Sequence, residues 1–155
     1  MRCIPQISAY VIASVMAFLI SSCSVQPCYE DTDPLMNTVL LASGTGESIT
    51  ADSLRVRGVS LTDTVEFVDA RSVTSFSVPL DPSSDLSLFY ITVNGIHDTA
   101  AIYYTRQPHL VSPECGYTFL SIITGVTTTH NIIDTLIIEN SKADLNGEKN
   151  LHLFF

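Results

Sequence analysis

From Leu35 onward, apolar and polar residues alternate with a period of two in short segments rich in Val, Ile, Thr, Phe and Tyr. This period predicts half-buried β-strands, which Gly, Pro, Asp, Asn and Ser separate at short intervals. No segment has the sustained 3.6-residue period of an amphipathic helix. Strands are therefore expected near residues 35–41, 53–59, 64–68, 72–80, 86–93, 99–105, 115–123, 132–139 and 150–155.

One strand is expected at the centre of a sheet. Leu86–Val93 is apolar on both faces for much of its length, as in a strand with neighbours on either side. Asn94-Gly95 follows it and is the strongest hairpin signal in the chain, because both residues adopt positive φ readily. Asn146-Gly147 marks a second turn, before the closing strand.

Together these strands predict an all-β fold, an antiparallel β-sandwich of Greek-key and immunoglobulin-like type. A small barrel is the alternative. The chain has 155 residues, too few for two cores of ordinary size. No linker divides the body, so residues 35–155 are expected to form the sandwich domain.

The N-terminal sequence predicts a targeting signal. Arg2 is followed by an eleven-residue apolar stretch, Tyr10–Ile20, which is too short to span a bilayer but suits a secretory signal peptide. The next residues, Ile20-Ser21-Ser22-Cys23, resemble a lipobox, in which small residues enter the peptidase and the thiol receives a diacylglyceryl group. An ordinary signal peptide with a chance cysteine is the alternative.

This signal divides the chain into three parts. Residues 1–22 are the expected lipoprotein signal peptide, residues 23–34 the lipidated N-terminus and a short tether, and residues 35–155 the folded body. Two or three acyl chains such as palmitate on Cys23 anchor a protein stably. Residues 24–27 are uncharged, which favours the periplasmic side of the outer membrane over the cell surface.

The cysteine count predicts one disulfide. Cys3 leaves with the signal peptide and Cys23 is acylated, so Cys28 and Cys115 remain in an oxidising compartment. Closing so long a loop stabilises the fold by roughly 4.5 kcal/mol in the chain-entropy model. Two unpaired buried thiols are the alternative. The chain has no CxxC motif for redox catalysis.

The amino-acid composition disfavours some classes of binding partner. The formal net charge is −9, which argues against nucleic acid and against anionic lipid headgroups as partners. The loop acids Asp31, Asp33, Asp81 and Asp85 offer oxygen ligands for Ca²⁺, but no EF-hand spacing occurs, and a solvated acidic surface explains them more simply.

Enzymatic motifs are missing from the sequence. The four histidines, His97, His109, His130 and His152, do not pair at metal-ligand spacing, and neither HExxH nor GxSxG occurs. No cofactor is expected. A hydrolase with an unfamiliar site is kept only as a third hypothesis.

Short motifs along the mature chain carry a resemblance to a known family. They are Cys23 and Cys28 with Thr32-Asp33-Pro34, Pro79-Leu80-Asp81, Tyr103-Tyr104, Glu114-Cys115-Gly116-Tyr117, Thr129-His130, Ile133-Asp134-Thr135 with Asn140, and the terminal His152-Leu153-Phe154-Phe155. With these the chain resembles a domain-of-unknown-function family of small lipoproteins common in Bacteroidetes. The resemblance implies an envelope lipoprotein with a β-rich fold and implies no activity.

The functional expectation follows from the anchor and the missing catalytic motifs. The leading hypothesis is a non-catalytic binding or structural module, anchored in the cell envelope by its lipid, with an envelope protein as a possible partner. The second is a small-ligand or glycan-binding lipoprotein that uses loop acids with Tyr103, Tyr104 and Tyr117. Burial of all three tyrosine rings would exclude the glycan hypothesis.

Overall fold

A computed structural model describes residues 27–60 and 63–155. The expected signal peptide and the expected acylation site, Cys23, lie outside the described residues. Among the residues that are described, none forms a helix long and apolar enough to span a bilayer.

The described part of the chain folds into ten strands. They are β1 (Leu35–Leu41), β2 (Ala51–Val59), β3 (Thr64–Val73), β4 (Ser75–Pro79), β5 (Leu86–Val93), β6 (Ile96–Ser112), β7 (Gly116–Thr128), β8 (Thr135–Ile138), β9 (Lys142–Ala143) and β10 (Lys149–Phe154).

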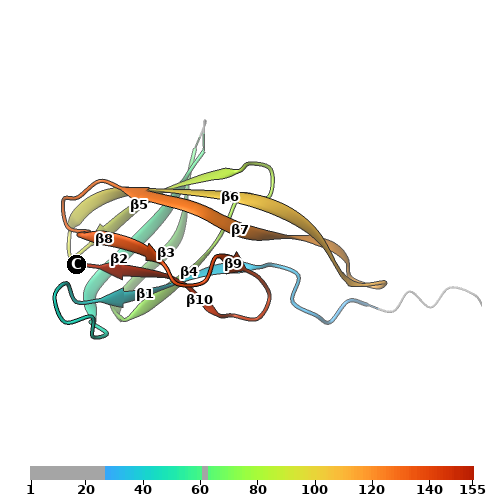
Figure 1. Ribbon diagram of the computed structural model, residues 1–155, viewed down its shortest axis with the longest axis horizontal. Coiled ribbons are helices and arrows are strands. Elements are labelled where there is room, and N and C mark those ends of the chain that lie inside the picture. Colours follow the sequence, from blue (N-terminus) through green and yellow to red (C-terminus); the bar gives the residue numbers. More distant parts are fainter. Residues whose placement is uncertain (1–26, 61–62) are drawn as a thin grey trace, which may run out of the picture.

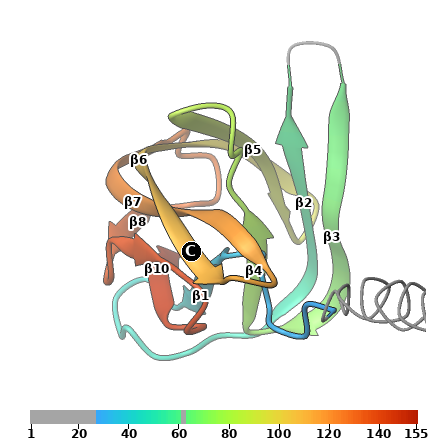
Figure 2. The ribbon, with the colours of Figure 1, turned by 90° about the vertical axis from the view of Figure 1, so that its right-hand side faces the viewer.

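These strands form two sheets that face each other, as Figures 1 and 2 show. The smaller sheet has the order β4-β1-β10-β8 and the larger sheet the order β3-β2-β5-β6-β7-β9. All neighbours run antiparallel except β1 and β10. The all-β sandwich is thus confirmed, whereas its Greek-key and immunoglobulin-like character stays a prediction.

The core forms between the two sheets because alternate residues of each strand point inward. β5 shows this most regularly, with Ser87, Phe89, Ile91 and Val93 buried and the intervening residues more exposed. It lies between β2 and β6, as its sequence predicts. The predicted hairpin follows it, with positive φ at both Asn94 and Gly95.

Two differences from the predicted strands matter for the rest of the molecule. β6 and β7 are far longer than the expected strands at 99–105 and 115–123, because polar residues and Pro108 continue the pairing as far as Ser112 and Gly116. β9 has only two residues, too few to show a period, and was not expected.

The chain changes sheets sharply between β3 and β4. Ser72 adopts φ 54°, and the Leu40 N–H donates to the Thr74 carbonyl, which fixes the corner. The segment expected as one strand, 72–80, is therefore bent at its start. β3 is an edge strand of the larger sheet and β4 is an edge strand of the smaller sheet, so this corner connects one edge of each sheet.

Candidate functional site

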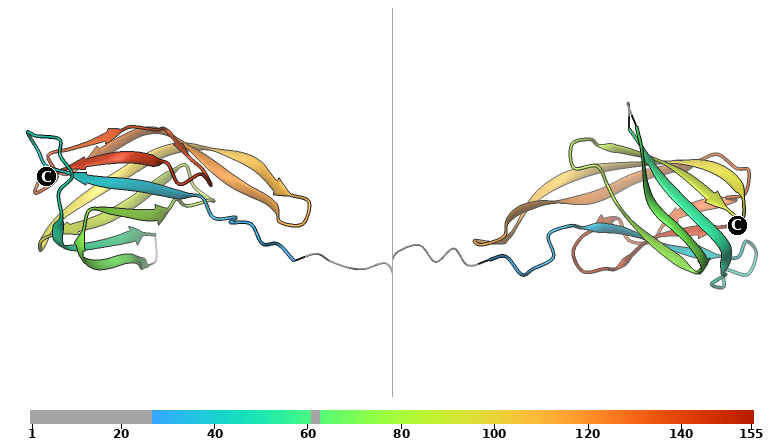
Figure 3. Two further views of the ribbon diagram at one scale, coloured as in Figure 1. Left: turned by 90° about the horizontal axis from the view of Figure 1, so that it is seen from below. Right: turned by 180° about the vertical axis from the view of Figure 1, so that it is seen from behind.

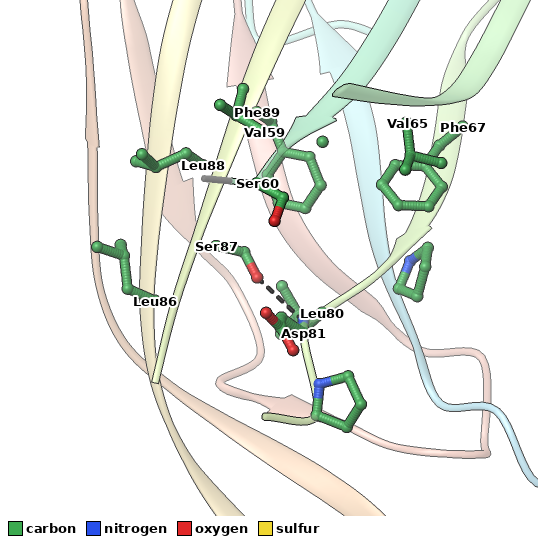
Figure 4. Close-up of a pocket in the computed structure, with 13 residues that line it drawn as sticks. Val59, Ser60, Val65, Phe67, Leu80, Asp81, Leu86, Ser87, Leu88 and Phe89 are labelled. Atoms are coloured by element: carbon green, nitrogen blue, oxygen red, sulfur yellow. Dashed lines mark hydrogen bonds between the residues drawn. The ribbon is translucent and has the colours of Figure 1, made fainter. Parts of the chain in front are cut away.

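An apolar pocket of about 250 Å³ opens where the ends of four strands meet (Figure 4). Its walls come from the end of β2, the start of β3, the segment after β4 and the start of β5. The lining side chains are Val59, Ser60, Val65, Phe67, Pro79, Leu80, Asp81, Pro82, Leu86, Ser87, Leu88 and Phe89, together with Gly58. Most are apolar, as is usual for sites that bind small molecules.

One wall of the pocket is an aromatic pair. The rings of Phe67 and Phe89 meet edge to face, with centroids 6.3 Å apart. Phe89 is buried, but Phe67 remains partly exposed at the free edge of the larger sheet. Gly58 allows this arrangement, because a Cβ atom there would lie only 2.5 Å from Cε2 of Phe67.

Beside the apolar wall lies a network of hydrogen bonds. The Tyr104 hydroxyl donates to the Asp81 carbonyl at 2.9 Å and pairs with the Ser87 hydroxyl at 2.8 Å. The Asp81 N–H donates to the same serine oxygen at 3.1 Å. Burial raises the pKa of Tyr104 above its ordinary value. The network fixes the segment after β4 against β5 and thereby shapes the pocket.

The Asp81 carboxylate belongs to a tight turn. It accepts hydrogen bonds from the Ser83 hydroxyl at 2.6 Å and the Ser83 N–H at 2.8 Å. These bonds, the one from the hydroxyl first, hold the pKa of Asp81 below its ordinary value. The Asp81 carboxylate is thus hydrogen-bonded within its own turn. The pocket is therefore suited to binding an apolar group that has a few polar atoms at its border.

The three tyrosines expected to form a glycan platform do not gather on one surface. Tyr104 is only 2% exposed, and its hydroxyl donates a hydrogen bond to the Asp81 carbonyl. Its ring therefore cannot stack on a sugar, and the expected glycan-binding role of Tyr104 is wrong. Tyr103 lies in the outer face of the larger sheet, opposite Leu86. Tyr117 is 74% exposed near the end of the β6–β7 hairpin.

The acids considered for Ca²⁺ do not converge either. Asp85 forms a salt bridge with Arg106 at 2.8 Å, and Asp31 and Asp33 lie in the segment before β1. Within residues 27–60 and 63–155, no group of three or more His, Cys, Asp or Glu side chains is placed to hold a metal ion.

The histidines have separate surroundings. His97 pairs with the Thr92 hydroxyl and His130 with the Ile133 carbonyl. His152 alternates with buried residues in β10 and lies 3.9 Å from Glu139. His109 is exposed on the β6–β7 hairpin.

Cys28 and Cys115 form the disulfide that the cysteine count predicts. Their Cα atoms are 4.8 Å apart although 87 positions separate them in sequence. Cys115 lies in the turn between β6 and β7, so the bond joins the start of the described chain to the end of the long hairpin.

Two features of the structure were not expected from the sequence. The pocket depends on Phe67 reaching across Gly58, although the strand register pairs Gly58 with Val65 and leaves Phe67 at a bulge, so the sequence pattern did not signal this contact. Asp98 begins one of four segments in which Asp is followed by Thr or Ser and then an apolar residue, the others beginning at Asp52, Asp63 and Asp134. Asp98 is buried and accepts four hydrogen bonds. The other segments of this kind provide no such network, so the pattern alone did not distinguish it.

Comparison with known proteins finds one family. A model described as a family of unknown function (DUF6452) matches residues 53–155, from β2 to the last residue. The match includes the pocket and Cys115 but not Cys28 or β1. No curated protein and no solved structure matches the chain.

Proposed function

The chain belongs to the DUF6452 family of unknown function, and we propose that it is a non-catalytic binding module of the cell envelope. Acyl chains on Cys23 hold it at the outer membrane, on the periplasmic side. Its binding site is the open pocket beside Phe67, and this pocket binds an apolar group of the ligand or partner. One observation carries the proposal: side chains of the inner face of β3 are exposed to solvent beside a preformed apolar hollow.

The exposure of β3 supports binding because inward-facing apolar residues are normally covered. Val65 is 52% exposed and Phe67 is 39% exposed, although both line the pocket. β4 ends at Pro79 and leaves this corner open. An apolar ligand, or an apolar side chain of an envelope protein, would complete the layer and gain roughly 25 cal/mol for each Å² removed from water.

Support for the anchor comes from the N-terminal sequence. Ile20-Ser21-Ser22-Cys23 follows an apolar stretch of the length found in signal peptides. We expect the Cys23→Ser protein to leave the membrane fraction, because it lacks the acylated thiol. Intact-mass analysis of the wild type should show a start at Cys23 carrying acyl chains. A wild-type protein with an unmodified thiol at this position would contradict the anchor.

A charge placed at the mouth of the pocket tests the binding site. Val65→Asp puts a carboxylate beside Phe67, and we expect affinity for a neutral naphthylamine probe to fall by about tenfold or more, since the charge would have to be desolvated. Ile137→Asp is the matched control, because Ile137 is also an exposed strand residue, 47% exposed, but lies in β8 of the smaller sheet.

The measurement is probe fluorescence titrated in the Cys23→Ser background, which contributes no acyl chains of its own. Saturable binding that Val65→Asp reduces and Ile137→Asp preserves would support the pocket. Equal binding by both variants would contradict it. Among the tyrosines considered for a glycan, only Tyr103 and Tyr117 stay exposed, and they lie far apart along the β6–β7 pair, opposite Gly125 and Leu110 respectively. The apolar pocket is therefore preferred over glycan stacking.

A further inference from the structure

The β6–β7 hairpin extends beyond the body of the sandwich as a two-stranded ribbon (Figure 3). β5 pairs with β6 only as far as Tyr103, and β9 pairs with β7 only at Ser121 and Ile122. From Gln107 to the turn, β6 therefore has β7 as its only paired strand. Six residues of extended chain correspond to a ribbon roughly 20 Å long.

One face of this ribbon is apolar and exposed. Pro108 lies opposite Phe119, and Leu110 lies opposite Tyr117, so the four side chains share a face. Phe119 and Leu110 are each almost half exposed and Tyr117 is 74% exposed. Side chains of this kind are normally covered when they gather on a strand pair.

The start of the described chain is fixed to the same ribbon. The disulfide joins Cys28 to Cys115 in the turn, and the Thr118 hydroxyl donates to the Thr32 carbonyl at 2.6 Å. Tyr29, next to the disulfide, is 86% exposed. The ribbon thus ends in a group of exposed aromatic and aliphatic side chains held close to residue 28.

The charge around this group is acidic. Glu30, Asp31, Asp33 and Glu114 lie in residues 27–35 and in the turn, and neither 27–35 nor 107–119 contains a Lys or Arg. Such a surface is repelled by anionic lipid headgroups. It is compatible with a neutral, zwitterionic headgroup layer, where the apolar rings rather than the charges make the contact.

We propose that the end of the β6–β7 ribbon lies in the interfacial layer of the membrane, with Tyr117, Leu110 and Tyr29 among zwitterionic headgroups. This inference rests on the proposed anchor at Cys23. Only four residues, 24–27, separate Cys23 from Cys28, and the five extended steps between the two cysteines span at most about 18 Å. The disulfide therefore keeps the ribbon, rather than any other part of the fold, next to the bilayer.

Tyrosine is suited to this layer because its ring is apolar and its hydroxyl stays hydrated. The acyl chains provide the anchor, and the ribbon then sets the orientation of the sandwich on the membrane. β6 runs from this end to Ile96 beside the Asn94-Gly95 turn, which places that turn roughly 45 Å away. The opposite end of β6 is thus directed away from the lipid.

The chain contains no tryptophan, so a single one can report its own position. The test uses full-length acylated Tyr117→Trp in phosphatidylethanolamine and phosphatidylcholine vesicles that carry brominated lipid, a quencher of nearby tryptophan. Ile96→Trp is the matched control, since Ile96 is also exposed and lies at the opposite end of the same strand, β6. Tyr29→Trp is a second reporter at the ribbon end. We expect several-fold stronger quenching at positions 117 and 29 than at position 96.

Three results would overturn part of this account, and they are distinguishable. If the acylated protein does not sediment with vesicles, the anchor itself is wrong. If it sediments but Tyr117→Trp is quenched no more than Ile96→Trp, the anchor stands and the membrane contact of the ribbon is wrong. A blue shift of Tyr117→Trp emission that depends on protein concentration and not on lipid would show a second copy covering the ribbon, which also contradicts the membrane contact.

Discussion

At the scale of single residues, Asp98 is the most deeply buried acidic side chain in the described part of the chain. It is 2% exposed, and its carboxylate accepts hydrogen bonds from the Thr129 hydroxyl and from the backbone N–H groups of residues 131–133. Burial alone would raise the pKa of Asp98, but these bonds outweigh it and hold the pKa below its ordinary value. The side chain thereby connects the β7–β8 loop to β6.

We expect Asp98→Asn to lower the free energy of unfolding at neutral pH by about 2–3 kcal/mol, because an amide N–H would face backbone donors. Because the pKa of Asp98 is lower in the folded than in the unfolded chain, its carboxylate stabilises the fold at pH values above the unfolded-state pKa of about 3.9. This stabilisation is lost as the pH falls through the folded-state pKa. The variant should therefore lose less stability on acidification than the wild type.

Urea unfolding at several pH values measures both effects. Asp52→Asn is the control, because Asp52 is also followed by a hydroxyl residue and an apolar residue, Ser53 and Leu54, but is exposed. It should change stability by no more than about 0.5 kcal/mol. Equal stability of the two variants would show that the Asp98 network does not stabilise the fold.

At the scale of elements, the packing of β3 on β2 depends on a single missing side chain. The Phe67 ring crosses the backbone of β2 at Gly58 and reaches Phe89. A strand glycine ordinarily weakens a sheet, yet here it makes room for a close approach. Strand positions follow from the alternating pattern, but this contact between neighbouring strands does not, because the pattern does not specify their register.

Gly58→Ala should therefore lower the free energy of unfolding by about 1–2 kcal/mol, since the new methyl group displaces the Phe67 ring from Phe89. Gly125→Ala in β7 is the matched control, because there the nearest atom, in Tyr103, lies at an ordinary 3.9 Å. Thermal unfolding followed by circular dichroism compares them. If Gly125→Ala is as destabilising as Gly58→Ala, the close approach to Phe67 is not the cause.

At the scale of the whole molecule, the disulfide determines where the N-terminal segment lies. It joins residues that are 87 positions apart, and it does so at the far end of a ribbon rather than in the core. Its stabilising effect therefore acts mainly through the unfolded chain, whose freedom it restricts. In the folded protein it directs the tether toward the same end as the exposed tyrosines.

Replacing both cysteines, as Cys28→Ala with Cys115→Ala, should lower the free energy of unfolding by up to about 4.5 kcal/mol in the chain-entropy model. Adding reductant should lower the melting temperature of the wild type and leave that of the double variant unchanged. A wild type that melts at one temperature with and without reductant would contradict a stabilising bond.

Sequence patterns predicted the all-β class, the central position of Leu86–Val93, the Asn94-Gly95 hairpin and the pairing of Cys28 with Cys115. The first three features depend on local alternation and turn chemistry, which act over short distances. The disulfide was predicted from the cysteine count, on the expectation that Cys3 is removed and Cys23 is acylated. Which residues meet across strands became clear only from the folded chain. The pocket at Phe67 arises from the register of neighbouring strands, and the apolar ribbon end arises from two strands that extend beyond their neighbours. Such relations join distant segments, and no local period encodes them.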